Sequence, residues 1–402
     1  MKNKVLIVGA ISSYSVRQFY EATINLNKVP VFLFHDGHIP QSTLLSKDNH
    51  IVTNCLSINR LEKTLSNIQF IIEDVFSVVP GGELAVPLTE QLCEVFELPF
   101  NKGDINRFRN KKIMREWLGK VSVAQPEQYG VVDSEDKVRA LAGKLKFPLI
   151  IKPVDGAASF FVKKIYHEEE LADAVSSIIA HKTSLATGVQ FEGQAILEQY
   201  IEGVEYSAEV MVCNGECKGF YITRKLLSDE PYFDEIGHIS LSPECYPENC
   251  EEFIFKVIDA MEVDSGVLHI EFRQNVNSSL YLIEVACRIA GDLISNLVQI
   301  KHGYSLEEFY IIARSVNSND EKEEKMSIKN LISLDNLVGI KFLFGEEVHS
   351  APFIKIIQQD IAQKYVKISN RSPQNVVNRT GYIIFETSSL NNAVDFIKDG
   401  LC

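Results

Sequence analysis

The sequence lacks the features that mark nucleic-acid-binding and membrane proteins. It has no block of lysine and arginine, and 40 basic against 54 acidic residues give a net charge of −14. Duplex nucleic acid requires a basic surface to neutralise its phosphates, so nucleic acid is not an expected partner. No run approaches the ~18 apolar residues that a membrane-spanning helix needs, so no membrane segment is expected.

Cysteine is also scarce, with eight residues in 402, a density too low for a disulfide scaffold. No CxxC pair is present to hold zinc. Cys213 and Cys217 flank Asn214-Gly215, a hairpin turn signal, so we expect both at strand ends. The start, MKNKVLIVGAISSY, has no clean cleavage site and predicts a first β-strand rather than a signal peptide. Together these features favour a reducing, cytoplasmic location.

Strand and helix patterns alternate over the first hundred residues. KVLIVGA and VPVFLFHD are strand-like, and the segment 14–26 between them has helical character. This alternation predicts a parallel, doubly wound, Rossmann-like sheet. The first turn, Gly9 to Ser13, does not have the GxGxxG pattern, so it gives little support to a dinucleotide site.

The rest of the chain divides by composition. A basic helical segment over 101–120 precedes a predicted hairpin, and antiparallel strands follow from residue 195. Residues 225–245 show no clear period and predict a long binding or lid loop. The polar, acidic stretch 316–327 predicts a linker before a small α+β tail. The expected domains are 1–106, 107–193, 194–315 and 316–402.

A lysine stands at the end of a strand in KFPLIIKPVDGAASFFVKKI, residues 146–165. The apolar run 147–151 leads to Lys152, a small-residue turn follows, and a second strand-like run covers 160–165. Backbone N–H groups of such a turn and the lysine ammonium can hold a phosphate chain. The alternative is an ordinary hairpin whose lysine extends into water.

Two glutamates lie in neighbouring strand patterns, Glu271 in HIEF and Glu284 in LIEVAC. Adjacent antiparallel strands would place their carboxylates side by side, where they repel unless a hard cation lies between them. Magnesium is bound in this way, together with the phosphate oxygens of a nucleotide. The alternative is that one glutamate faces solvent or pairs with Arg273. Arg288, four residues beyond Glu284, suits a developing oxyanion or a transferred phosphate.

Four stretches in this order resemble the ATP-grasp enzymes over roughly residues 100–315: FRNKKIMRE, FPLIIKPVDGAASFFV, ILEQYIEGVEYSAEV, and HIEF with LIEVACRIAGD. The resemblance implies an α/β and α+β chain, with an ATP-grasp fold after a Rossmann-like domain and before a small C-terminal α+β subdomain. It also implies ATP and Mg²⁺ as cofactors, with Mn²⁺ as a substitute.

The resemblance implies a role for each matching position. Lys111 and Lys152 contact the α- and β-phosphates, and Ser159 belongs to the ATP-binding loop. The strand Glu198, Gln199, Tyr200 and Ile201 carries adenine, and Glu205 accepts hydrogen bonds from the ribose. Glu271 and Glu284 hold magnesium, and Arg288 stabilises the acyl-phosphate and the tetrahedral species that follows it.

Within that superfamily, PYFDEIGH and EVACRIAGD resemble the L-amino-acid ligases of the bacilysin-synthetase type. A Glu-x-x-His on the lid loop faces the substrate pocket in those enzymes, and the matching positions here are Glu235 and His238. His238 would orient a substrate as a catalytic residue, Glu235 would receive an ammonium, and Asp292 would face the same pocket. The alternative for His238 is a loop histidine that caps a turn.

Two departures from the pattern affect the expected site. Ala158 and Phe161 stand where the phosphate loop usually has glycines, which predicts a stiffer loop with Phe160 or Phe161 over the nucleotide. Ala286 replaces the asparagine that often supplies a further metal ligand, which predicts a weaker or differently hydrated second metal site.

The expected reaction joins an amino-acid or carboxylic-acid substrate to an amine through an acyl-phosphate, with release of ADP and phosphate. Other expectations stay open: an acyl transfer to a carrier-protein thiol or a natural-product amine, a carboxylase, and a nucleotide-binding protein without catalysis. Arg107, Arg109, Lys111 and Lys112 form the one basic cluster that could receive an acidic carrier protein. A homodimer is expected by analogy.

Overall fold

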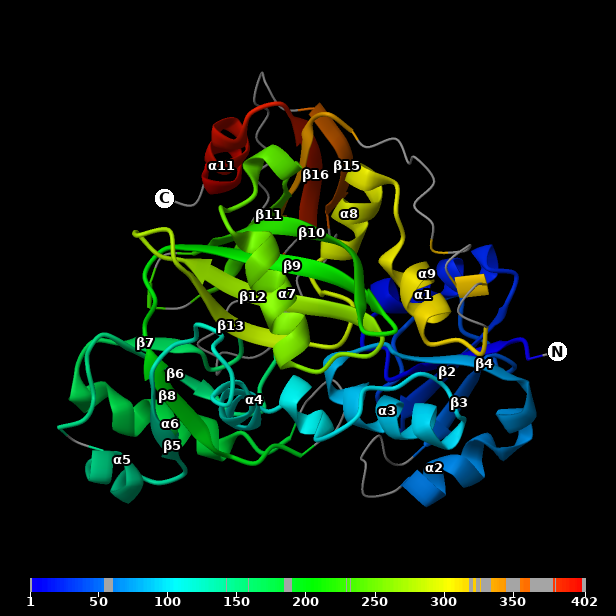
Figure 1. Cartoon of the computed structure of the whole chain (residues 1–402), viewed down its shortest axis with the longest axis horizontal. Coiled ribbons are helices and arrows are strands. Elements are labelled where there is room, and N and C mark those ends of the chain that lie inside the picture. The colour runs from blue at the N-terminus through cyan, green and yellow to red at the C-terminus, as the bar shows by residue number, and fades with distance from the viewer. Residues whose placement is uncertain are drawn as a thin grey trace.

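The computed structural model describes residues 2–53, 61–141, 143–157, 159–183, 190–228, 230–231, 233–317, 321–322, 326, 334–344, 355–361, 379 and 381–399. These residues form three sheets, each the centre of one body of the molecule (Figure 1). Among the described residues, no helix combines the length and the apolar character that crossing a bilayer requires.

The N-terminal body is a parallel four-stranded sheet in the order β3-β2-β1-β4. Val5 to Val8 are fully buried because helices cover both faces of the sheet. Ser12 starts the first helix with a reciprocal capping box to Ser15. This confirms the predicted Rossmann-like domain, whose elements are β1 (Lys4–Val8), α1 (Ser13–Asn25), β2 (Val29–His35), β3 (His50–Thr53), α2 (Leu61–Ile68), β4 (Val75–Pro80) and α3 (Val86–Val95).

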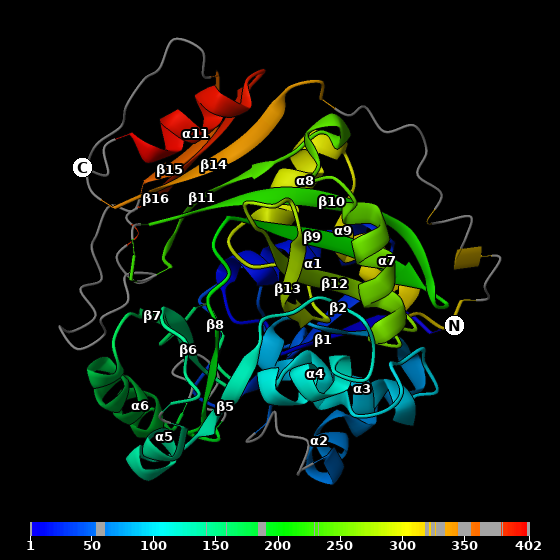
Figure 2. The same ribbon diagram turned by 60° about the vertical axis from the view of Figure 1, so that its left-hand side comes forward.

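The second body is an antiparallel sheet in the order β5-β8-β6-β7, with two helices packed beside it (Figure 2). The predicted hairpin is present, since β6 and β7 pair from Leu149 with Ile165 to Ile151 with Lys163. Its elements are α4 (Lys111–Leu118), which leads into it, β5 (Gln128–Val132), α5 (Glu135–Leu141), β6 (Leu149–Pro153), β7 (Lys163–Ile165), α6 (Leu171–Ala180) and β8 (Ala195–Gln199).

The third body is an antiparallel sheet in the order β13-β12-β9-β10-β11-β14-β16-β15. Asn214 and Gly215 form the predicted turn between its first two strands, and both flanking cysteines lie where expected. Its elements are β9 (Val204–Cys213), β10 (Glu216–Leu227), β11 (Glu235–Ser240), α7 (Cys250–Ala260), β12 (Gly266–Gln274), β13 (Leu280–Ala286), α8 (Ile294–His302), α9 (Leu306–Ala313), β14 (Leu337–Leu343), β15 (Lys355–Ile361), β16 (Gly381–Thr387) and α11 (Leu390–Lys398).

The prediction of a long loop over 225–245 is wrong for the centre of this segment, where the strand β11 lies between β10 and β14. The strand is buried on both faces from Ile236 onward, so it lacks the alternation that reveals a half-exposed strand. Gly237 is required there, because a Cβ would lie 2.5 Å from the carbonyl oxygen of Ile340 in β14.

The C-terminal strands continue the large sheet rather than forming a sheet of their own. The predicted boundaries at residues 106, 193 and 315 stay a prediction. Of the predicted linker, residues 318–320, 323–325 and 327 lie outside the described residues.

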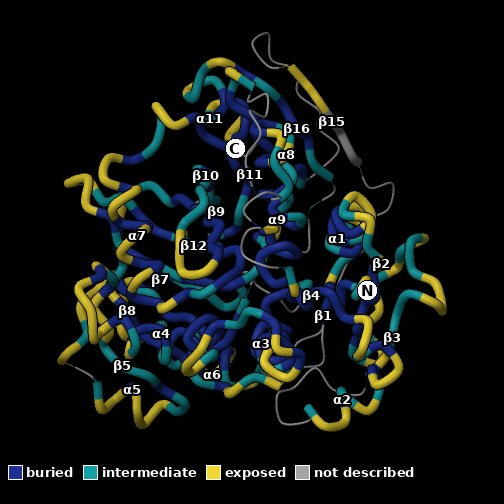
Figure 3. Tube along the Cα trace, turned by 45° about the vertical axis from the view of Figure 1, so that its right-hand side comes forward, coloured by how far each residue is buried: buried dark blue, intermediate teal, exposed yellow. Residues whose placement is uncertain are grey.

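A buried ion pair joins the N-terminal body to the large sheet. Arg314, which follows α9, places Nη2 2.5 Å from Oε1 of Glu90 in α3. The other carboxylate oxygen of Glu90 accepts a hydrogen bond from the backbone N–H of Asn101 at 2.7 Å. Both charged residues are buried, and Figure 3 draws the buried parts of the chain in dark blue. These contacts fix the position of the N-terminal body against the cavity described next.

Candidate active site

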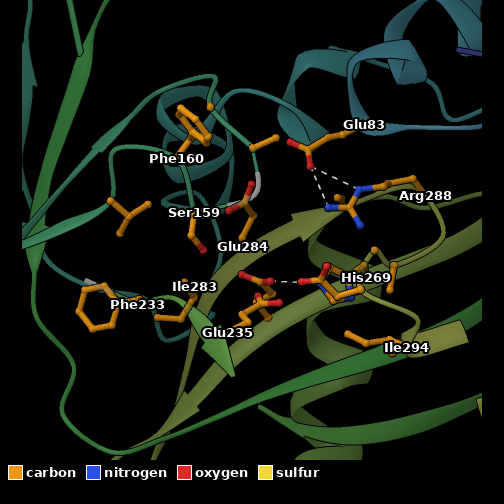
Figure 4. A pocket seen from close by; sticks show the side chains of 18 of the residues that line it. Glu83, Ser159, Phe160, Phe233, Glu235, His269, Ile283, Glu284, Arg288 and Ile294 are labelled. Carbon is orange, nitrogen blue, oxygen red and sulfur yellow. Dashed lines mark hydrogen bonds and ion pairs between the residues drawn. The ribbon is translucent and has the colours of Figure 1, made fainter. Parts of the chain in front are cut away.

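Thirteen of the fourteen predicted site residues line one cavity of about 420 Å³. The exception is His238. The cavity has walls from all three bodies, and Figure 4 shows side chains from them converging on it. The set that lines it is Lys111, Lys152, Ser159, Glu198, Gln199, Tyr200, Ile201, Glu205, Glu235, Glu271, Glu284, Arg288 and Asp292.

Two buried lysines lie at the expected phosphate end. Lys152 is the next-to-last residue of β6, and its Nζ lies 2.8 Å from Oε2 of Glu198. Lys111 begins α4, where Asn110 caps the helix, and its Nζ bonds Oε1 of Glu284 at 2.7 Å and the carbonyl oxygen of Gly156 at 2.9 Å. The structure therefore does not support the alternative of a lysine extended into water, since Lys152 is 4% exposed.

Glu198 has a second cationic partner that the sequence reasoning did not include. Arg115 Nε lies 2.6 Å from Oε1 of Glu198. Burial opposes ionisation of this carboxyl, but Arg115 and Lys152 outweigh it and lower the pKa of Glu198 to about 2. The sequence did contain a signal for Arg115, because it lies four residues after Lys111 and the two share one face of the helix.

The phosphate loop keeps a glycine-type backbone without the glycines. Ser159 and Phe161 have φ values of 53° and 58°, the left-handed region that bulky residues seldom adopt. Phe160 lines the cavity, while Phe161 packs against the core of the small sheet. The expected cover of the nucleotide by Phe160 or Phe161 stays a prediction; Ala158 lies outside the described residues.

Glu271 and Glu284 are direct partners in the register of β12 and β13, as the strand patterns predicted. Arg273 does not pair with either glutamate; its Nε bonds Oε2 of Glu205 at 2.8 Å. Lys225 Nζ lies 2.6 Å from Oε1 of Glu271, and Lys111 Nζ lies 2.7 Å from Oε1 of Glu284. Each carboxylate thus already holds a cation, and two facing carboxylates fit Mg²⁺ completed by phosphate and water oxygens.

Lys225 of β10 is a site residue that the sequence reasoning missed. Its side chain is 2% exposed, and its Nζ also lies 2.7 Å from Glu235 and 3.2 Å from Glu205. Burial works against its charge, but the three carboxylates hold the pKa of Lys225 well above its usual value. His269 bonds the same oxygen of Glu271 at 3.1 Å. Burial disfavours the charge of Glu271, and Lys225 and His269 still hold its pKa well below the usual value.

Arg288 is oriented by a carboxylate from the N-terminal body (Figure 4). Its Nη2 and Nε lie 2.8 Å and 3.3 Å from Oε2 of Glu83, and Arg109 Nη1 approaches the other oxygen at 3.7 Å. Glu83 follows Gly81-Gly82 in the turn after β4. Sequence reasoning missed Glu83 because nothing in that turn indicates which distant cation it meets.

The Glu235–His238 pair lies in β11, so its placement on a loop is corrected. His238 is fully buried, with Nε2 3.2 Å from Glu235 Oε2 and 4.0 Å from Asp292 Oδ2. It stands behind two carboxylates that line the cavity, which places it to orient them rather than to touch a ligand. Asp292 is itself held by Arg379, whose Nη1 lies 2.7 Å from Oδ1.

Comparison with known proteins agrees with this geometry. Residues 145–296 match the ATP-grasp domain family. This segment is therefore similar to an ATP-grasp domain. This segment runs from the phosphate hairpin through Glu284 and Arg288. It includes Lys152 with its partner Glu198, and it includes Glu284 but not the partner of Glu284, Lys111.

Relatives of this ATP-grasp chain are named as synthases and ligases. Dapdiamide A synthase of Enterobacter agglomerans is 23% identical over 273 residues, 66% of this chain and 61% of that protein. A D-alanine–D-alanine ligase of Xanthomonas axonopodis pv. citri is 25% identical over 164 residues, 38% of this chain and 47% of that protein. The chain thus spans less than two thirds of these relatives.

The whole fold is that of solved ATP-grasp proteins. The structure of an L-amino acid ligase from Bacillus licheniformis matches with a TM-score of 0.71 and 18% identity, over 99% of this chain and 96% of that one. At this identity the match establishes the fold, including the N-terminal and C-terminal bodies on either side of the ATP-grasp segment.

The basic cluster considered for a carrier protein is not a surface of this ATP-grasp chain. Arg107 is fully buried against the backbone carbonyls of Met261 and Glu262, and Arg109 is 9% exposed. Lys111 is committed to the cavity, which leaves Lys112 as the partly exposed member. The cluster therefore offers no docking patch for an acidic carrier.

Proposed function

We propose that this protein is an ATP-dependent carboxylate–amine ligase that forms a dipeptide-like amide between an amino-acid carboxylate and an amine. The observation that carries the proposal is one cavity lined by two buried lysines, two glutamates paired in the strand register, and Arg288. These are the groups that a phosphate chain, a metal and a reacting carboxylate would require.

Each residue has a proposed part in the reaction. Lys111 and Lys152 would bind the α- and β-phosphates with Ser159, the segment 198–201 would read adenine, and Glu205 would hold the ribose. Glu271 and Glu284 would hold Mg²⁺, with Mn²⁺ as a substitute, and the ion would neutralise charge on the phosphates. Lys111 and Lys225 must then leave these carboxylates and turn toward phosphate.

The chemical steps balance without a further reactant. A substrate carboxylate oxygen attacks the γ-phosphorus of ATP, and ADP leaves. The amine nitrogen then attacks the acyl carbon, phosphate leaves, and the nitrogen loses a proton. Arg288 would stabilise the acyl-phosphate and the tetrahedral oxyanion, because its guanidinium is fixed by Glu83 and carries charge into a water-poor site. Glu235 and Asp292 would face the amino-acid substrates, with His238 behind them.

The proposal is tested by phosphate release from ATP and magnesium with the twenty amino acids supplied singly and in pairs. Release that requires one pair, with the amide found by mass spectrometry, is the expected result. Release with one amino acid alone would indicate an acyl-phosphate that awaits another acceptor. ATP binding without release for any pair would support the reading as a nucleotide-binding protein, for which Ala286 is the first position to examine.

Arg288→Ala should lower kcat for amide formation by about 10²-fold or more, as loss of an oxyanion donor does in other enzymes. The KM for ATP should change little, because Arg288 pairs with Glu83 and not with the adenine or ribose residues. The kcat of Arg288→Lys should lie between those of the wild type and Arg288→Ala, since lysine keeps the charge but not the planar guanidinium. Steady-state kinetics with saturating ATP measures this, and an unchanged kcat in Arg288→Ala would remove Arg288 from the chemistry.

A further inference from the structure

One part of the cavity, called the arm here, is lined by helix α1 and by the segment from Ile289 into α8 and α9. Helix α1 lies beside α9 in both ribbon views, and Asn25 Nδ2 bonds Glu308 Oε1 across them at 2.8 Å (Figures 1 and 2). Ile294, at the opposite side of the close-up from Phe233, belongs to this arm (Figure 4). The arm is thus separate from the adenine end.

The charges on the cavity wall are balanced with one exception. Eight acidic side chains line the cavity, and seven of them pair with a lysine or arginine. The exception among the described residues is Glu307, in the first turn of α9. Its Oε2 accepts a hydrogen bond from the Ser305 hydroxyl at 3.4 Å, and the Ser295 hydroxyl is its other side-chain partner.

Glu307 is deeply buried, with 2% of its surface exposed. A buried carboxylate is costly unless a cation or several good hydrogen bonds compensate it. Burial raises the pKa of Glu307, and the hydroxyls of Ser295 and Ser305 only partly oppose this. A cation that enters the arm would supply the missing compensation.

The rest of the arm suits a long side chain with a polar end. Phe19, Ile289 and Ile294 contribute apolar wall, while Gln18 and Tyr14 add an amide and a hydroxyl to the lining. With the Glu307 carboxylate they offer acceptors that suit the N–H donors of an ammonium or a guanidinium.

We infer that Glu307 binds the basic side chain of the carboxylate substrate, so that the donor amino acid is one that ends in an ammonium or guanidinium. The inference rests on the proposed function for its statement that the ligand is the carboxylate donor. The binding itself does not depend on turnover. The reason is that Glu307, a buried carboxylate without a lysine or arginine partner among the described residues, lies on the wall of the cavity in this arm.

The test is calorimetric binding of diaminobutyrate, ornithine, lysine and arginine, each against norleucine, to the full chain with Mg²⁺ and a non-hydrolysable ATP analogue. At least one basic amino acid should bind about 10- to 100-fold more tightly than norleucine, the range expected for a charged hydrogen bond. Glu307→Gln should remove this preference while the ATP analogue binds as before. Glu308→Gln, one residue along the same helix and outside the cavity, is the matched control and should keep it.

Each outcome decides between the two proposals. Equal affinity for norleucine and every basic amino acid would overturn the inference, as would a preference that Glu307→Gln retains. Selective binding of a basic amino acid without phosphate release for any acceptor would support the site and contradict the ligase function. Thermal unfolding of both variants identifies a misfolded protein, and in that case Glu307→Asp, which keeps the charge, should retain the preference if the inference holds.

Discussion

Glu284→Gln is expected to lower kcat/KM for ATP-dependent amide formation by about 10³-fold or more, since metal stabilisation of phosphoryl charge is worth several kcal/mol. Glu284 is the partner of Glu271 in the strand register, and glutamine keeps its shape but removes the charge that a divalent cation needs. The variant also frees Lys111 from its 2.7 Å contact, so affinity for ATP without magnesium should not fall.

Phosphate release and amide formation, both at saturating magnesium, measure this effect. Glu216→Gln is the matched control, because Glu216 lies at the exposed β9–β10 turn and pairs with the neighbouring Lys218. Full ATP-dependent amide formation by Glu284→Gln would contradict the proposed metal role of Glu284. A loss of amide formation in Glu216→Gln as well would indicate a general folding defect of the variants rather than a role of Glu284.

Glu90→Gln is expected to reduce the free energy of unfolding by about 3–5 kcal/mol, the usual cost of breaking a buried ion pair by removing one partner. Arg314 would keep its charge in a fully buried position with no carboxylate at 2.5 Å to balance it. The pair joins α3 to the segment after α9, so the N-terminal body should also loosen against the active-site cavity.

Denaturant unfolding of the intact chain gives this number. The double variant Glu90→Leu with Arg314→Met should recover much of the loss, because it removes both charges and leaves none unpaired. An exposed pair, Glu135 with Arg139 on α5, provides the contrast, and Glu135→Gln should leave the unfolding midpoint nearly unchanged. A stability loss in Glu90→Gln no larger than in Glu135→Gln would show that the buried pair contributes little.

Local sequence patterns were sufficient to predict those features of the site that depend on residues close together in the chain. Glu271 and Glu284 sit in alternating strands joined by a short turn, so their pairing follows from the strand period alone. The same is true of the hairpin that presents Lys152. β11 had no such signal, since a strand buried on both faces shows no alternation, and Glu235 and His238 were therefore expected on a loop.

The charge partners of the site could not be predicted, because they come from segments far apart in the sequence. Glu83 meets Arg288 across 205 residues, and Lys225 gathers carboxylates from three different strands. No periodicity relates such positions, and only the packing of the three bodies brings them within hydrogen-bond distance. The same packing buries Arg107, which composition alone had suggested as part of a surface patch.

The sequence by itself determined the fold class, the order of the candidate site residues and their chemistry, because residue type and strand or helix period are local properties. The tertiary structure decided which of these groups are compensated. It placed a cation against seven of the eight cavity carboxylates and left Glu307, among the described residues, with two hydroxyls and a backbone hydrogen bond but no lysine or arginine. That distinction depends on distances between segments, and the free energy of a buried charge depends on those distances more than on any residue's identity.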